Sequence, residues 1–130
     1  MDPAVEQRLR SAYAAFVAGD VDAAVAGIHP DAELVNPPDA IETGTRHGRE
    51  ELRATFRRLH DEFEFESLDV LEMFEGPSGV VVVSHWVGRG RRSGAPLEAM
   101  LTHVFELNDG LVVTYRWFRS IAEGRAAAGL

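Results

Sequence analysis

The chain contains no cysteine among its 130 residues. This absence excludes a disulfide framework, a thiol nucleophile and a thiolate metal site. Long hydrophobic runs are missing too: no apolar stretch is long enough to span a bilayer, and the N-terminus lacks the basic-then-apolar layout of a signal peptide. We therefore expect no membrane partner and a cytoplasmic location.

Basic residues are also scarce, since 13 Lys and Arg face 21 Asp and Glu and give a formal net charge of −8. Nucleic acid is therefore not an expected partner, because phosphate contacts need a basic face. The five histidines show no metal-ligand spacing on any one predicted element, which argues against a metal site. Gly88-Arg89-Gly90 lies inside a predicted strand and lacks the strand-turn-helix setting of a phosphate loop, so no cofactor is expected.

What the chain does have is the composition of one globular domain, expected to cover residues 1–130, with 45% hydrophobic and 26% charged residues. Helical signals come first. Asp2-Pro3 predicts an N-cap with Pro at the first helical position, and apolar residues at helical spacing follow until Gly19-Asp20. A short second helix is expected to run as far as Ile28, and a third helix is expected to follow Gly48.

Strand signals occupy most of the remaining sequence. We expect a brief strand over residues 32–36, a long loop over 37–47, and strands over 63–74, 80–91, 96–107 and 111–119, followed by a short terminal helix over 121–128. Three helices followed by a strongly curved, mainly antiparallel sheet is an α+β design.

The final hairpin holds the most informative pattern. A three-residue loop over 108–110 would place His103 opposite Tyr115 and Leu101 opposite Trp117, with Phe105 on the same face. Such a face can hold a small, mostly apolar ligand and still offer proton chemistry. Aromatic sheet faces are also often solid core, with a buried His and Tyr simply paired, and this alternative stays open.

The preceding turn decides where the first tryptophan points. If Ser93-Gly94 forms a two-residue turn, Trp86 pairs with Leu101 and faces the pocket, while His85 faces outward. A slip of one residue would exchange the two side chains between the faces.

Several motifs in order give the chain a resemblance that covers nearly its whole length. Residues 13–23, 29–38, 48–52, 103–110 and 126–130 are together similar to the SnoaL-like branch of the nuclear transport factor 2-like superfamily. The resemblance implies a cone in which helices close over a curved sheet around a deep pocket. It also implies a small apolar or carbonyl-containing ligand and a homodimer formed through the outer sheet face.

The resemblance does not bring a complete active site with it. In ketosteroid isomerase relatives the proton-shuttling Asp ends the first strand just before a Pro, and the matching residue here is Asn36, which cannot abstract a proton near neutral pH. Asn36 would instead orient a carbonyl or a water, or cap the Pro-rich loop. The oxyanion-binding acid of those isomerases matches His103, and their helix-one Tyr matches Ala12 or Tyr13.

Two other branches of the superfamily match only in part. Polyketide cyclase relatives carry a His at the position of His103, but their partner acid corresponds to Trp117. The limonene epoxide hydrolase pattern needs an Arg and an Asp where Leu101 and His103 stand, so it is absent.

The candidate catalytic residues are His103 as acid/base, Tyr13 as oxyanion donor (a role that Tyr115 could also take), Asn36, and Asp39 as a replacement base. The candidate ligand-binding residues are Phe16, Trp86, Leu101, Phe105, Tyr115, Trp117 and Arg119.

Two functions fit this set. A cofactor-free isomerase, cyclase or hydrolase would place an abnormally titrating His103 in an open cavity with Tyr115, Trp117 and Asn36. A non-catalytic binder or accessory dimer would pair the polar atoms of its cavity with one another.

Overall fold

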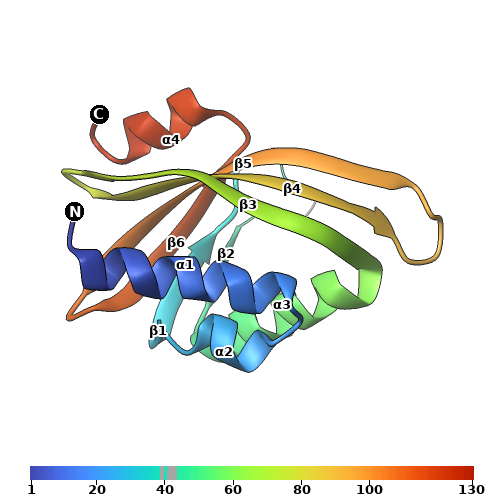
Figure 1. The fold of residues 1–130 in the computed structure, drawn as a ribbon. Helices are drawn as coiled ribbons and strands as arrows, with labels where there is room; N and C mark the ends of the chain where they lie inside the picture. The colour runs from blue at the N-terminus through green and yellow to red at the C-terminus, as the bar shows by residue number, and fades with distance from the viewer. Residues whose placement is uncertain (39, 41–43) are drawn as a thin grey trace.

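The structure is a computed structural model that describes residues 1–38, 40 and 44–130. Its helices pack on a mixed six-stranded sheet with strand order β2-β1-β6-β5-β4-β3 (Figure 1). The α+β prediction is confirmed, including the three N-terminal helices, the curved sheet and the short C-terminal helix. None of the helices in the described ranges has the length and apolar character needed to cross a bilayer.

The helices begin where the sequence supplies a cap. In α1 (Pro3–Val17) the Asp2 side chain accepts a hydrogen bond from the Ala4 N–H at 2.8 Å, and Pro3 needs no partner in the first turn. Asp20 caps α2 (Val21–Val25) in the same way. α3 (Arg49–Glu62) follows Gly48, which has a φ of 91°.

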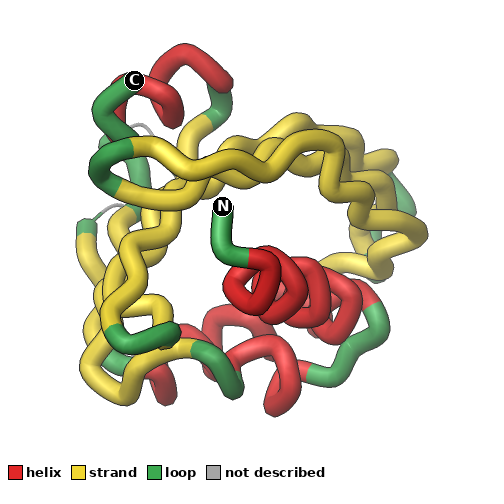
Figure 2. Tube along the Cα trace, turned by 60° about the vertical axis from the view of Figure 1, so that its left-hand side comes forward, coloured by secondary structure: helices red, strands yellow, loops and turns green. Residues whose placement is uncertain are grey.

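The sheet has two faces with different coverings. Its strands are β1 (Ile28–Val35), β2 (Thr45–His47), β3 (Phe63–Gly76), β4 (Gly79–Gly90), β5 (Pro96–Asn108) and β6 (Leu111–Phe118). The described pairings are antiparallel apart from β1 with β6, which is parallel. Figure 2 shows α1 inside the curve of the sheet, whereas α4 (Ile121–Ala127) lies on its opposite, outer face.

Two predicted boundaries were wrong near the first strand. Ile28 opens β1 and pairs with Val112 instead of continuing the second helix. The expected loop over 37–47 ends in a strand, because residues 45–47 pair with residues 33–35 of β1. In both places pairing with a neighbouring strand overrides the local sequence preference.

The predicted register of the last hairpin was also wrong, by two residues. Its turn has two residues, Asp109 and Gly110, with φ angles of 52° and 79° that define a type I′ turn, and a bulge follows between the Glu106 and Leu107 pairings. His103 therefore lies opposite Trp117, and Phe105 lies opposite Tyr115. Because side chains alternate with period two, this even shift leaves His103, Phe105, Tyr115 and Trp117 on their predicted face. Next to the turn the bulge changes the alternation, and Val112 lies in the inner core cluster.

The register of the β4–β5 hairpin also differs from the predicted one by two residues, so its side chains keep their predicted faces. Trp86 pairs with Ala99 and Leu101 pairs with Ser84, because the connection spans residues 91–94 and not only Ser93-Gly94. Trp86 is 9% exposed and belongs to the inner core cluster. His85, one residue earlier, lies on the outer face opposite the exposed Met100.

Candidate functional site

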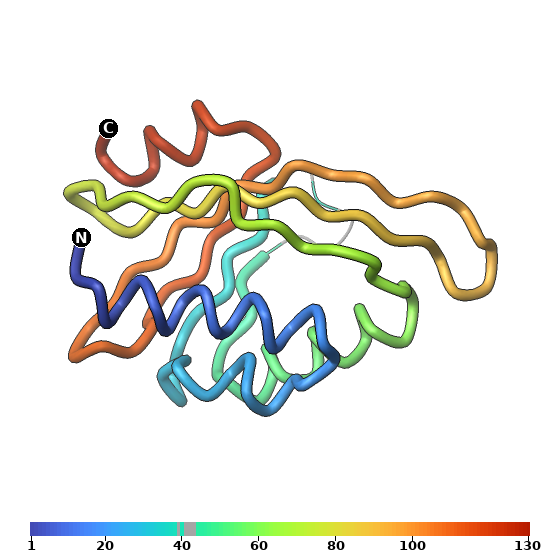
Figure 3. The backbone as a smooth tube through the Cα atoms, in the orientation of Figure 1, coloured from blue at the N-terminus to red at the C-terminus, as the bar shows by residue number. Residues whose placement is uncertain are grey.

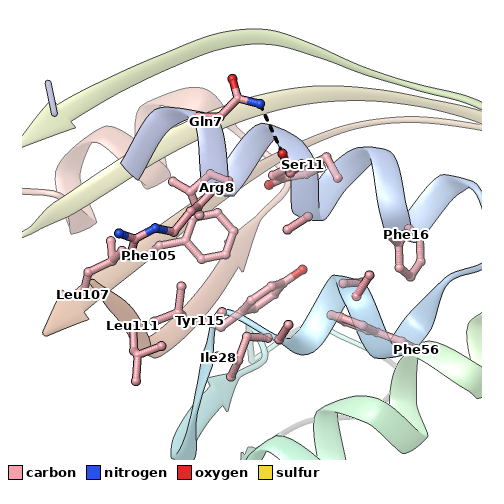
Figure 4. A pocket seen from close by; sticks show the side chains of 18 of the residues that line it. Gln7, Arg8, Ser11, Phe16, Ile28, Phe56, Phe105, Leu107, Leu111 and Tyr115 are labelled. Atoms are coloured by element: carbon pink, nitrogen blue, oxygen red, sulfur yellow. Dashed lines mark hydrogen bonds between the residues drawn. The ribbon is translucent and has the colours of Figure 1, made fainter. Parts of the chain in front are cut away.

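A pocket of about 500 Å³ lies between α1, α2 and the inner face of the sheet (Figure 4). Its inner end is formed by buried side chains such as Phe16 and Trp86, and its outer end by exposed residues of α1 near the β5–β6 turn. The full lining consists of Gln7, Arg8, Leu9, Ser11, Ala12, Tyr13, Phe16, Ala23, Ala24, Ala26, Gly27, Ile28, Phe56, Leu59, Leu68, Trp86, Phe105, Leu107, Gly110, Leu111, Val112 and Tyr115.

A chain of three polar side chains forms one wall of this pocket. The Tyr13 hydroxyl lies 2.7 Å from Nδ1 of His103, and the Tyr115 hydroxyl lies 3.0 Å from Nε2 of the same ring. Both tyrosines line the pocket, whereas His103 is 2% exposed and lies behind them. Helix α1, strand β5 and strand β6 each supply one member.

Burial keeps this Tyr13–His103–Tyr115 relay electrically neutral. Burial lowers the pKa of His103 from 6.5 to about 3, because the imidazolium would lose its hydration. Burial likewise raises the pKa of Tyr13 and of Tyr115 well above 10, and for Tyr13 the proximity of Tyr115 adds to the effect. At neutral pH the relay therefore consists of one imidazole and two phenols.

Proton counting gives the relay a direction. A neutral imidazole has one donor and one acceptor nitrogen, so one tyrosine donates to it and the other accepts from it. The short 2.7 Å contact fits an O–H of Tyr13 donating to Nδ1, and the 3.0 Å contact fits an Nε2–H donating to Tyr115. We assign the protons in this way. The O–H of Tyr115 is then not used by His103 and can serve a ligand.

Aromatic rings hold the relay in place. Phe105 stacks on His103 with a centroid distance of 5.7 Å, and the Trp86 centroid lies 6.3 Å away. The Trp86 indole N–H donates to Ser84 Oγ at 2.8 Å, and Ser84 in turn donates to the Leu101 carbonyl at 3.3 Å. The indole N–H of Trp86 and the hydroxyl of Ser84 thus both have partners within the protein.

Three predicted site residues form a group near the C-terminal end of β6, apart from the relay. The Trp117 indole N–H donates to Oδ1 of Asn36 at 2.8 Å, and the Arg119 guanidinium lies 5.2 Å from the centre of the Trp117 ring. Asn36 also donates through Nδ2 to the Gly44 carbonyl, at 3.2 Å, and through its backbone N–H, at 3.1 Å. These contacts match the loop-capping role of Asn36.

The predicted site residues therefore divide into two sets. Tyr13, Phe16, Trp86, Phe105 and Tyr115 line the pocket. The described lining does not include His103, Leu101, Trp117, Arg119 or Asn36, and Asp39 lies outside the described residues. The expectation that His103, Trp117 and Asn36 share one open cavity with Tyr115 was wrong, because Tyr13 and Tyr115 cover the imidazole and Asn36 occupies the indole N–H.

Sequence reasoning missed the polar residues at the pocket mouth. Gln7 donates to Ser11 Oγ at 3.3 Å (Figure 4). Arg8 Nη1 donates to the Gly110 carbonyl at 2.9 Å. Helical spacing identifies the buried stripe of α1 but not which flanking residues border a cavity. Figure 3 shows the first turns of α1 near the β5–β6 turn. The hydrogen bond from Arg8 to Gly110 joins these two segments, and no local sequence pattern encodes it.

Metal binding finds no support in the described ranges, where no three His, Asp or Glu side chains are grouped as a metal would require. The histidine with the most polar contacts, His103, meets only phenolic hydroxyls through its ring nitrogens.

The comparisons with known proteins agree with this architecture. The chain is similar to a provisionally named isomerase from Bacillus subtilis (16% identity, 99% of this chain and 96% of that chain, TM-score 0.82). It is also similar to an NTF2-like protein from Burkholderia thailandensis (26%, 95% and 98%, 0.75) and to a provisionally named SnoaL-like polyketide cyclase from Mesorhizobium loti (12%, 88% and 97%, 0.71). A search of curated proteins found no significant match. The model of the SnoaL-like domain matches residues 9–115, and the chain therefore belongs to the SnoaL-like family, as the motifs predicted.

Proposed function

We propose that this protein binds a small, predominantly apolar molecule carrying one hydrogen-bond acceptor, such as a ketone carbonyl, and does not itself transfer a proton. The observation that carries the proposal is an apolar pocket lined by the hydroxyls of Tyr13 and Tyr115, which both contact His103. Because a neutral imidazole accepts only one hydrogen bond, one of these hydroxyls keeps a proton for a ligand, and we assign it to Tyr115. A pocket of about 500 Å³ suits a fused-ring or branched ligand. The carbonyl would accept from Tyr115 while the apolar body contacts Phe16, Phe105 and Trp86.

Two observations favour binding over proton transfer. The described lining of the pocket contains no Asp or Glu. His103, the expected acid/base, has a pKa lowered to about 3 by burial and reaches the pocket only through Tyr13 or Tyr115. A general base works best with a pKa near the operating pH, so this imidazole is better suited to orienting hydroxyls than to accepting protons.

We also propose that two copies associate through the outer sheet face, as the family resemblance implies. Two large apolar side chains support this arrangement: Met100 on β5 and Ile121 at the start of α4 are each 42% exposed. Exposed apolar side chains rimmed by polar residues are typical of protein interfaces. His85 and Glu98, 3.1 Å apart beside Met100, would form part of such a rim.

The test of ligand binding uses a matched pair, 2-decalone and decalin, which differ mainly in the carbonyl group. We expect quenching or enhancement of Trp86 fluorescence by both, with the ketone binding about fivefold more tightly, as one hydrogen bond of about 1 kcal/mol requires. In Tyr115→Phe the two affinities should become equal, because the donor is gone while the apolar wall remains. Trp117→Phe keeps Trp86 as the only reporter and should not change the ratio.

Two results would contradict the proposal. Absence of binding by both compounds at millimolar concentration would remove the ligand-binding function. Exchange of the α-protons of 2-decalone for deuterium that requires the native protein and is lost in His103→Gln would instead establish the proton-transfer alternative.

A further inference from the structure

The pocket has one charged side chain among its described lining residues, and it is a cation. Arg8 lies at the mouth, where α1 approaches the β5–β6 turn, in a chain whose formal net charge is −8. The polar side-chain groups in the remaining lining are the hydroxyls of Tyr13, Tyr115 and Ser11, the amide of Gln7 and the indole N–H of Trp86, which donates to Ser84. The charge at the pocket mouth therefore has the opposite sign to the net charge of the chain.

Arg8 is held in position without being neutralised. Its Nη1 donates to the carbonyl of Gly110 in the β5–β6 turn, and the guanidinium has four further N–H groups. Among the described residues, no acidic side chain forms an ion pair with Arg8, and this includes Asp109 in the same turn. Arg10, two residues along the same helix, pairs instead with Glu6 at 3.1 Å.

From this geometry we infer that the natural ligand is an amphipathic monocarboxylate, with its apolar body inside the pocket and its carboxylate on the Arg8 guanidinium at the mouth. The inference rests on the proposed function and adds the charge and orientation of the ligand. A guanidinium presents paired donors that match the two oxygens of a carboxylate. The neutral relay at the inner wall offers no cation to pair with a carboxylate. A carboxylate buried there would be unpaired, so it must stay at the mouth.

The negative net charge of the protein does not oppose this arrangement strongly. At physiological ionic strength exposed charges are screened over about 8 Å, so a carboxylate at the mouth is governed mainly by Arg8. Glu6, two residues before Arg8 on α1, is engaged by Arg10, and residues two apart on a helix do not face each other. The attraction is therefore local and should weaken as salt is added.

The test compares decanoate with 1-decanol at pH 7.5, where the acid is ionised, and uses 2-decalone as a neutral reference for the pocket. In the native protein at low salt we expect decanoate to bind about three- to tenfold more tightly than decanol, as for a charge-assisted hydrogen bond at a partly exposed site. Arg8→Gln should reduce this ratio to about one, while Arg8→Lys should keep part of it. Arg10→Gln, the matched control on the same helix, should leave the ratio unchanged.

The possible results distinguish a failure of the carboxylate inference from a failure of the proposed ligand-binding function. If 2-decalone binds but decanoate has no advantage over decanol, or if Arg8→Gln and Arg8→Lys both keep the full ratio, the carboxylate inference is overturned and the pocket function stands. If 2-decalone does not bind, the proposed function itself fails. A ratio that stays constant between 20 and 500 mM NaCl (about a fivefold change in screening length) would also overturn the inference, since an exposed ionic contact must weaken with salt.

Discussion

The two faces of strands β4 and β5 differ sharply although they alternate along the same backbone. The outer face packs Val81, Val83 and Val104 against Ala128 of the C-terminal segment, all at most 1% exposed. The inner face carries His103 and large rings, and it borders a cavity of about 500 Å³. The same register thus produces a tightly filled core on one side and a hollow on the other.

The difference lies in the shape and polarity of the side chains. Branched aliphatic groups close around one another, and α4 completes their packing. Aromatic rings are rigid, and those of the inner face are fixed by hydrogen bonds of Tyr13, Tyr115 and Trp86, so they cannot collapse into the space between them. An unfilled cavity costs stability. The tight outer face and the two hydrogen bonds of the relay together offset that cost.

The largest effect is expected at the tightest contact of the outer face. Gly124 of α4 is so close to Thr102 of β5 that a Cβ at Gly124 would overlap the Thr102 methyl group. Ala normally stabilises a helix interior relative to Gly, but here we expect Gly124→Ala to lower the unfolding free energy by about 2–3 kcal/mol through overpacking. Urea denaturation measures the change.

Two further variants sharpen this prediction. Thr102→Ser removes the overlapping methyl group and should recover part of the loss when combined with Gly124→Ala. Gly27→Ala, where nothing lies within 4 Å of the added Cβ, should stay within about 0.5 kcal/mol of the native protein. A Gly124→Ala protein as stable as the native one would show that the outer face is not close-packed.

A smaller, pH-dependent effect is expected on the inner face. The pKa of His103 is lowered from 6.5 to about 3 in the folded state by burial, so between these values the unfolded chain binds a proton that the folded one excludes. Unfolding free energy should therefore fall as the pH is lowered below 6.5, by about 1.4 kcal/mol per pH unit from this group. His103→Gln should cost about 1–2 kcal/mol at pH 7 through lost relay hydrogen bonds, and its disadvantage should shrink at pH 5.

Urea unfolding at several pH values tests this prediction. His85→Gln, on the outer face of the adjacent strand, is the matched control and should retain the slope due to His103. Parallel stability profiles for the native protein and His103→Gln would mean that the imidazole is not buried as a neutral group.

The sequence predicted the inner face well and the site only in part. Alternation placed His103, Tyr115 and Trp86 on the inner face even though both hairpin registers were off by two residues, since only an odd shift exchanges faces. The family motifs predicted the cone. Sequence alone did not reveal that Tyr13 and Tyr115 cover His103, nor that Arg8 reaches Gly110, because such contacts depend on how α1 crosses the sheet.

The smallest effect on folding is expected where the outer face is not covered by α4. Met100 is 42% exposed, so Met100→Glu should change the unfolding free energy of the monomer by less than about 0.5 kcal/mol. If the outer face joins two copies, the same variant should shift the mass measured by light scattering from dimer to monomer, because two carboxylates would meet across a two-fold axis. Leu130→Glu, which changes an apolar residue that is 49% exposed, should leave the dimer intact. A native protein that is monomeric at 100 µM (about 1.4 mg/mL for a chain of 14.3 kDa) would refute the dimer. The outer face around Met100 would then be ordinary solvated surface.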